Sequence, residues 1–310
     1  MCSLTNREPI FLLGAALVGH EQERDLRHAW DALRANIRDA LLNDPATRDR
    51  YRREHGEGLP DVQASGLYQS QGYYRILRPS DPDYWRRNRA WLHEALRLTR
   101  THEVKFLCVW TQLEDQVTPT ALVDTLRPYT RGEAAAQRLA RTLTNPYLQL
   151  IPPLLHRLYR AALQRERTVG IVWDDDHDSR GFQNLGVYQA LQAQGHFKRT
   201  TQPSFSDVRQ EPLLGLADVL GYVAGRYLYG VLTEQVPPDI EDWWHTYVQP
   251  SLLAVDVTDD REAEWALTVD LALAQHGLAV VEPSERENLR QQLVRGIDSI
   301  QAHGDFPGTR

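Results

Sequence analysis

Residues 213–232 are apolar over most of their length, and the first three turns of the helix that they predict carry one charge, Asp218. Gly215, Gly221 and Gly225 lie at positions that share a helical face with this aspartate, so backbone rather than side chains surrounds the carboxylate. A carboxylate removed from water costs several kcal/mol unless it is paired, protonated or bound to a cation. Two interpretations stay open: a core acid bonded to an arginine or a backbone amide, and an acid of a ligand site.

A second acidic site follows a predicted strand. Residues 168–173 (TVGIVW) are apolar and rich in β-branched side chains, which is typical of a buried strand. Four acids come after it, which are Asp174, Asp175, Asp176 and Asp178. The carboxyl ends of strands in open α/β sheets bind ligands, and carboxylate oxygens suit Mg²⁺ or Mn²⁺. Asp174 adjoins the strand and is the candidate ligand, while a solvated aspartate turn is the competing interpretation of the run.

Residues 203–207 (PSFSD) predict another short extended segment, which ends in Asp207. If the fold brings Asp174, Asp207 and Asp218 together, the three carboxylates would form a divalent-metal site. The aspartate run itself does not match a calcium loop of the helix–loop–helix type, because Ser179 and Leu185 stand where Gly and Glu are needed. It also matches the aspartyl-phosphate motif of phosphatases poorly.

Composition narrows the class of protein. The chain has 310 residues, of which 42% are hydrophobic, enough for a large globular core. Its two cysteines exclude a disulfide framework. The sequence predicts neither a secretory signal nor a membrane span, and we therefore expect a cytoplasmic location. No glycine-rich phosphate loop, serine nucleophile elbow or metalloprotease helix occurs in the sequence.

Two groups of arginines interrupt an otherwise acidic chain of net charge −7. The first contains Arg48, Arg50, Arg52 and Arg53, and the second contains Arg86, Arg87 and Arg89 between Trp85 and Trp91. Such groups can hold phosphates beside stacked bases. The competing interpretation is a solvated helix face, on which Asp49 and Glu54 neutralise the first group.

The order of the elements predicts an α/β protein. Strands are expected at 11–18 and 104–110, and helices at 21–42 and 83–100. Residues 43–60 predict a loop or a short exposed helix, and 119–163 predict a helical region interrupted near Asn145-Pro146 and Pro152-Pro153. A helix is expected after Gly181. The expected division is an α/β domain at 1–236 with helical insertions and a helical C-terminal extension at 237–310, with helices near 262–276 and 283–302.

Four segments together resemble one protein family. Residues 11–18 resemble its first long strand, and 61–65 (DVQAS) resemble its Glu-x-His-Ala segment. Residues 171–174 (IVWD) are similar to its central strand and acid, and 214–218 (LGLAD) are similar to its Leu-Gln-x-Ala-Asp helix start, the most specific match. The family is the domain-of-unknown-function 3800 family. The resemblance covers about residues 11–226 and implies a ribonuclease H-like fold, which is a mixed sheet flanked by helices.

The resemblance also implies an activity, namely that of a metal-dependent nuclease or phosphodiesterase acting on nucleic acid. Asp174 and Asp218 would be its catalytic residues. With Asp207 and Asp61 as further ligands, they would hold one or two Mg²⁺ or Mn²⁺ ions that activate water and stabilise the leaving oxygen.

The chain departs from the family pattern in four places. Residues 1–9 contain no Asp-Glu-Ser-Gly motif, which implies either a start assigned too late or a branch that has lost the motif. Asp61, Gln63 and Gly215 stand where the family has Glu, His and Gln. The alternative function is therefore a catalytically degenerate ribonuclease H-like protein that binds nucleic acid or a protein partner through the same groove, with Asp218 kept for structure.

Overall fold

The computed structural model describes residues 10–75, 82–112, 119–174, 199–201 and 203–253, together with residues 284, 287 and 288. The chain divides into two compact units. Unit 1 comprises Met1–Ser3, Gly14–Leu107 and Ser206–Leu253, and unit 2 comprises Leu4–Leu13, Cys108–Phe205 and Ala254–Arg310. Each unit is therefore assembled from segments that are distant in sequence.

Strands in the described residues form two small sheets. β1 (Ile10–Leu17) pairs with β2 (Lys105–Gln112), and β3 (Val172–Asp174) pairs with β4 (Ser204–Ser206). These bounds confirm the strands predicted near 11–18 and 104–110 and the extended segment near 203–207. The strand predicted at 168–173 begins later than expected, because Val169 forms only an isolated parallel bridge with Thr200. A mixed α/β chain is confirmed, but each sheet has two strands in the described ranges, which do not contain the larger mixed sheet expected.

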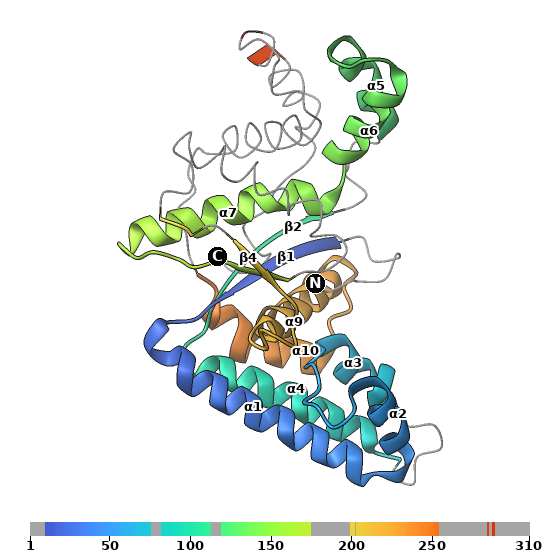
Figure 1. Cartoon of the computed structure of the whole chain (residues 1–310), viewed down its shortest axis with the longest axis vertical. Coiled ribbons are helices and arrows are strands. Elements are labelled where there is room, and N and C mark those ends of the chain that lie inside the picture. Colours follow the sequence, from blue (N-terminus) through green and yellow to red (C-terminus); the bar gives the residue numbers. More distant parts are fainter. Residues whose placement is uncertain are drawn as a thin grey trace. The chain divides into compact units, whose positions relative to one another are not determined.

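Helices make up most of unit 1. They are α1 (His20–Asn43), α2 (Pro45–His55), α3 (Ala64–Gln69), η1 (Gly72–Tyr74), α4 (Tyr84–Thr101), α9 (Leu214–Leu232), α10 (Pro238–Trp243), η5 (Trp244–Val248) and η6 (Gln249–Ser251). The predicted helices at 21–42, 83–100 and 213–232 are confirmed. α1 and α4 lie side by side (Figure 1). On α1 the expected apolar positions are buried, namely Leu26, Trp30, Leu33, Ile37 and Leu41.

α2 is the helical form of the segment predicted as a loop or a short exposed helix. Pro45 occupies its first turn, where the missing N–H costs nothing, and the side chain of Asp44 accepts a hydrogen bond from Ala46 N. The helix is not fully exposed, since Thr47 and Tyr51 are completely buried. Pro45, a loop signal in the sequence, therefore marks the start of a helix.

α9 is buried on most sides and closes with a tight turn. Glu234 adopts a left-handed conformation (φ 55°), and Gln235 N donates to Gly230 O (2.7 Å), as in a Schellman motif. The chain then folds back over Gly230, where an added Cβ would lie 2.7 Å from Val236 Cα. Only glycine fits this point of contact between two backbones.

Unit 2 contains α5 (Pro119–Leu126), η3 (Arg127–Tyr129), α6 (Glu133–Leu143) and α7 (Pro146–Gln164). The interruption predicted near Asn145-Pro146 is confirmed. The one predicted at Pro152-Pro153 is wrong, because α7 continues through both prolines. Its apolar residues on both sides of the pair are buried, namely Leu150, Ile151, Leu154, Leu155 and Leu158, and this packing outweighs the lost backbone hydrogen bonds.

Several expectations fall outside the described residues. They include Asp175, Asp176 and Asp178, the helix after Gly181 and most of the helices near 262–276 and 283–302. The domain division at 236/237 also stays a prediction, because most of the C-terminal extension expected at 237–310 lies outside the described residues. The segment that follows it is helical as expected, from Pro238 to Ser251. Among the described helices, none combines the length and apolarity that crossing a bilayer requires.

The contact at Gly230 gives a test of the fold. Helix propensity alone predicts that Gly230→Ala stabilises α9 by about 1 kcal/mol. The backbone contact predicts the opposite, a loss of about 1–3 kcal/mol in the free energy of unfolding. Urea unfolding followed by circular dichroism measures the difference. Gly170→Ala is the control, because its Cβ would make only an ordinary contact with Thr201 Oγ1 (3.9 Å). A Gly230→Ala variant as stable as wild type would contradict the described end of α9.

Candidate functional site

Two of the predicted acids belong to neighbouring segments of unit 1. The backbone N–H of Ala64 donates a hydrogen bond to Asp218 Oδ2 (2.8 Å), although the two residues are 154 positions apart. At Gly215, one turn earlier on α9, an added Cβ would lie 3.4 Å from Val62 O. The segment that contains Asp61 therefore runs against the start of α9. Asp218 is half-buried, and its bond to a backbone amide is the contact expected of a structural acid.

Asp61 lies in an irregular segment that side chains from other elements hold in place. Its carbonyl oxygen accepts hydrogen bonds from the hydroxyls of Tyr73 (2.7 Å) and Tyr74 (2.8 Å). The carbonyl oxygen of Pro60 accepts a hydrogen bond from Nε of the buried Arg34 (2.8 Å). In contrast, the carboxylate oxygen Oδ1 of Asp61 is buried and accepts no hydrogen bond from the described residues. Buried acceptors nearly always have a partner, so this oxygen is a place for a water or a cation.

His55 completes this group of side chains at the end of α2. Its ring stacks on Tyr51 (centroids 5.3 Å apart) and meets the edge of Tyr73 (4.6 Å). Burial lowers the pKa of His55 below its usual value, while the charge of Asp61 raises this pKa and that of Arg209 lowers it. The ionisation of His55 therefore depends on the charges of both Asp61 and Arg209, which lies in the turn before α9.

The tyrosines of the group remain protonated. Burial raises the pKa of Tyr51 to about 12, and burial also raises the pKa of Tyr73 and of Tyr74 above the usual range. Both hydroxyls on the Asp61 carbonyl are consequently neutral donors over the whole physiological range. They fix the backbone of Asp61 without adding charge beside its carboxylate.

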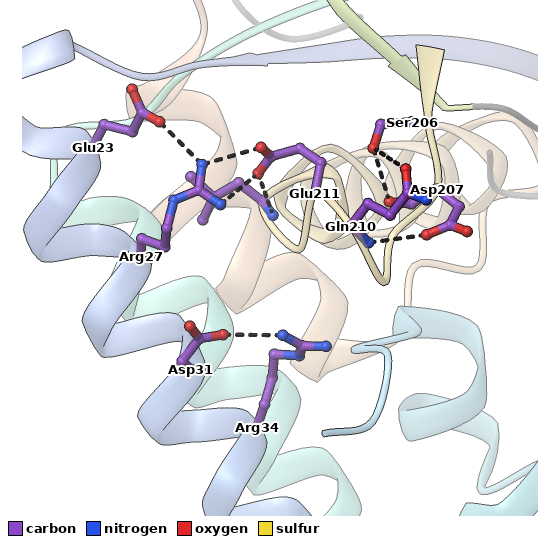
Figure 2. A network of polar contacts seen from close by, with 9 residues as sticks. Glu23, Arg27, Asp31, Arg34, Ser206, Asp207, Gln210 and Glu211 are labelled. Atoms are coloured by element: carbon purple, nitrogen blue, oxygen red, sulfur yellow. Dashed lines mark hydrogen bonds and ion pairs between the residues drawn. The ribbon is translucent and has the colours of Figure 1, made fainter. Parts of the chain in front are cut away.

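A separate polar network ties the segment before α9 to α1 (Figure 2). Arg27 donates from Nη1 to Glu211 Oε1 (2.9 Å), from Nη2 to Glu211 Oε2 (3.1 Å) and from Nη2 to Glu23 Oε1 (3.0 Å). The hydrogen bond with Glu211 is the main reason that the pKa of Arg27 is raised. Glu211 Oε1 also accepts a hydrogen bond from Leu213 N (3.2 Å), so the pair fixes the start of α9.

The other two candidate ligands have different surroundings. Asp207 is exposed, and its Oδ1 accepts hydrogen bonds from Arg209 N (2.8 Å) and Gln210 N (2.9 Å) (Figure 2). It therefore caps its own turn, as the competing interpretation of such acids expects. Asp174 ends β3 in unit 2 and is half-buried. Its proximity to Asp218 stays a prediction.

The second arginine group is largely paired within the protein. Arg86 lies 3.3 Å from Asp83, Arg87 lies 3.6 Å from Asp44, and Arg89 lies 2.7 Å from Asp239, measured between nitrogen and oxygen. The guanidinium groups also lie over aromatic rings, Arg86 and Arg89 over Trp85 and Arg87 over Trp91. The alternation of arginine and tryptophan thus supports intramolecular cation–π contacts.

Sequence reasoning identified Asp61 and Asp218 but missed His55, Arg34, Tyr73 and Tyr74. Their common feature is a contact with the irregular segment around Asp61, which no local pattern encodes. Of these four residues, only Tyr73 and Tyr74 could have been noticed in the sequence, as two adjacent large side chains that follow Gly72. Across the part of the chain that the structure describes, no three His, Cys, Asp or Glu residues come together as a group that could hold a metal ion.

Comparison of the chain with protein-family models, with curated proteins and with solved structures found no match. The family resemblance of the four segments therefore stays a prediction that rests on their residues.

The environment of His55 predicts how its proton behaves. Because its pKa is lowered on folding, the unfolded chain binds the proton more tightly, and His55 should reduce the free energy of unfolding as the pH falls from above 6.5 through its folded-state value. Proton NMR titration of the ring measures this pKa. Asp61→Asn removes a charge that raises it and should lower it further, whereas Arg209→Gln should raise it. Shifts of the opposite sign in both variants would refute the described surroundings of His55.

Proposed function

We propose that this chain is a divalent-metal-dependent phosphodiesterase that acts on nucleic acid and has a ribonuclease H-like arrangement at its core. The hydrogen bond from Ala64 N to Asp218 Oδ2 (2.8 Å) carries the proposal. It joins residues 61–65 to residues 214–218, two of the four segments that resemble the family. Their contact is what a shared fold requires, whereas two accidental resemblances would have no reason to meet.

The donor set fits a hard cation. Asp61 Oδ1 is a buried acceptor without a hydrogen-bond partner among the described residues, and carboxylate oxygens are preferred ligands of Mg²⁺ and Mn²⁺. An ionised carboxylate has about four acceptor positions, so the bond from Ala64 is compatible with a second role for Asp218. We propose Asp61 and Asp218 as ligands, both of which belong to unit 1, while the role expected for Asp174 of unit 2 stays a prediction. Asp207 is the weakest candidate, because its Oδ1 already caps a turn.

The residues of the chain itself would fix the two carboxylates before any ligand binds. The amide of Ala64 orients Asp218, and the hydroxyls of Tyr73 and Tyr74 hold the backbone of Asp61. Such outer contacts determine how well carboxylates are placed for a cation. A bound divalent ion would supply Lewis acidity toward a phosphate oxygen and a lowered pKa for an attacking water.

A second candidate function is the catalytically degenerate binding module. Gln63 is exposed at the position where the family has a histidine, and glutamine cannot replace histidine as a base. The bond between Ala64 and Asp218 also joins the two segments without any additional group. In that case Asp218 is a structural acid.

Metal binding separates the two functions. A cation at about ten times its Kd stabilises the folded state by about 1.4 kcal/mol, which corresponds to a rise in Tm of roughly 2 °C for a chain of this size. We expect this rise with millimolar Mg²⁺ or Mn²⁺ in differential scanning fluorimetry, together with cleavage of a labelled oligonucleotide. Asp218→Asn and Asp61→Asn should each abolish the rise and the cleavage.

Both variants are designed to remain folded without metal. Asparagine at 218 keeps an oxygen that can accept the Ala64 N–H, and Tyr73 and Tyr74 bond the backbone of Asp61 rather than its side chain. Glu57→Gln is the matched control, because it removes one carboxylate from an exposed position. If wild type shows no thermal shift, or if Asp218→Asn is unfolded in metal-free buffer, Asp218 is structural and the binding module is the better description.

A further inference from the structure

Three basic groups follow one face of α2 toward the Asp61 segment. Arg48, Arg52 and His55 are spaced by four and three residues, so they lie along one face of the helix, and we call them the α2 stripe. The two arginines are separated by a rise of about 6 Å along the axis. Arg52 is exposed, while Arg48 and His55 are half-buried. The stripe therefore presents a row of donors at the surface.

The arginines of the stripe have no acidic partner among the described residues. Arg48 donates from Nε to the carbonyl oxygen of Leu42 (2.7 Å), which leaves its charge uncompensated. Arg50 on the same helix differs, because it pairs with Glu54 (3.4 Å). The four arginines of α2 are thus not equivalent, and those of the stripe keep a free positive charge.

A further cation lies close to the end of the stripe. Arg209 is exposed, forms no ion pair with the described residues and lies in the turn before α9, whose start contacts Val62 and Ala64 next to Asp61. Burial is the main cause that lowers the pKa of His55, and the charge of Arg209 lowers it further. The charge of Asp61 acts on the same imidazole in the opposite direction. The ionisation of His55, the last residue of the stripe, therefore depends on the charges of both Arg209 and Asp61.

We propose that the α2 stripe and Arg209 bind the phosphate backbone of a nucleic-acid strand and lead it to Asp61 and Asp218. The inference rests on the proposed function and names the surface that this function uses. Cations repeated at the interval of a helical turn fit repeating phosphates better than one isolated anion. The net charge of −7 makes the protein as a whole repel nucleic acid, so binding is confined to such a local surface.

Salt dependence of binding tests the surface without requiring catalysis. The probe is a fluorescein-labelled oligothymidylate of about 20 nucleotides, longer than the ~4–16 nucleotides of one single-strand binding site. Fluorescence anisotropy is measured in EDTA over a series of salt concentrations. Each phosphate contact contributes about 0.7 to the slope of log K against log salt for a single strand. Arg52→Gln and Arg209→Gln should each reduce this slope by about that amount, and the double variant by about twice as much.

Arg50→Gln is the matched control and should leave affinity and slope unchanged, because Arg50 is already paired. Arg52→Lys and Arg209→Lys keep the charge and should recover most of the binding. Oligouridylate in a parallel titration distinguishes RNA from DNA as the preferred strand, and a reduced slope with either strand supports the proposal. Absence of binding at low salt, or an equal loss in Arg50→Gln, overturns it. Binding that depends on Arg52 and Arg209 in a protein that shows neither a metal-induced thermal shift nor cleavage would leave the surface standing and refute the phosphodiesterase.

Discussion

Helix α9 can approach its neighbours in unit 1 only because residue 215 is glycine. A Cβ at this position would lie 2.9 Å from Cζ2 of Trp30, whose indole is buried in α1, and 3.4 Å from the carbonyl oxygen of Val62. A buried indole in a close-packed core cannot move aside without disturbing its own contacts. The missing side chain therefore sets the distance at which Asp218, one turn further along, reaches the amide of Ala64. The contact between Asp218 and the segment that contains Asp61 depends on that approach.

The segment between α2 and α3 has no regular structure, yet side chains from elsewhere satisfy its backbone. Tyr51 donates to the carbonyl oxygen of Gly58, Arg34 to that of Pro60, and Tyr73 and Tyr74 to that of Asp61. Each such bond contributes about 1 kcal/mol and spares a buried polar group the cost of losing water. Donors from α1, α2 and η1 thus hold an irregular segment in place. A carboxylate held in this way is better placed for a cation than one on an unsupported loop.

Apolar periodicity predicted the helices near 20–43 and 84–101, and continuous apolar runs predicted the strand near 10–17 and the buried helix near 214–232. Such patterns failed where a long-range contact outweighs a local signal. The sequence of α2 is polar, yet its Tyr51 is completely buried. In α7, the burial of apolar residues stabilises the helix although it contains Pro152 and Pro153. For the site, the position of one acid among glycines indicated Asp218. The donors around Asp61 come from three different elements, so no spacing of residues in the sequence predicts them.

The arginines show why composition cannot define a binding surface. In sequence, the groups around Tyr51 and between Trp85 and Trp91 look equally suited to phosphates. In the structure, the second group is neutralised by Asp83, Asp44 and Asp239, which lie on different elements. An arginine held by a carboxylate must lose that partner before it can bind a phosphate, so its net gain is small. The arginines that remain available for phosphates are those that form no ion pair with the described residues. Arg48 bonds only a carbonyl oxygen, and no acidic partner is described for Arg52. A surface for nucleic acid is therefore determined by which charges the fold leaves unpaired rather than by how many it contains.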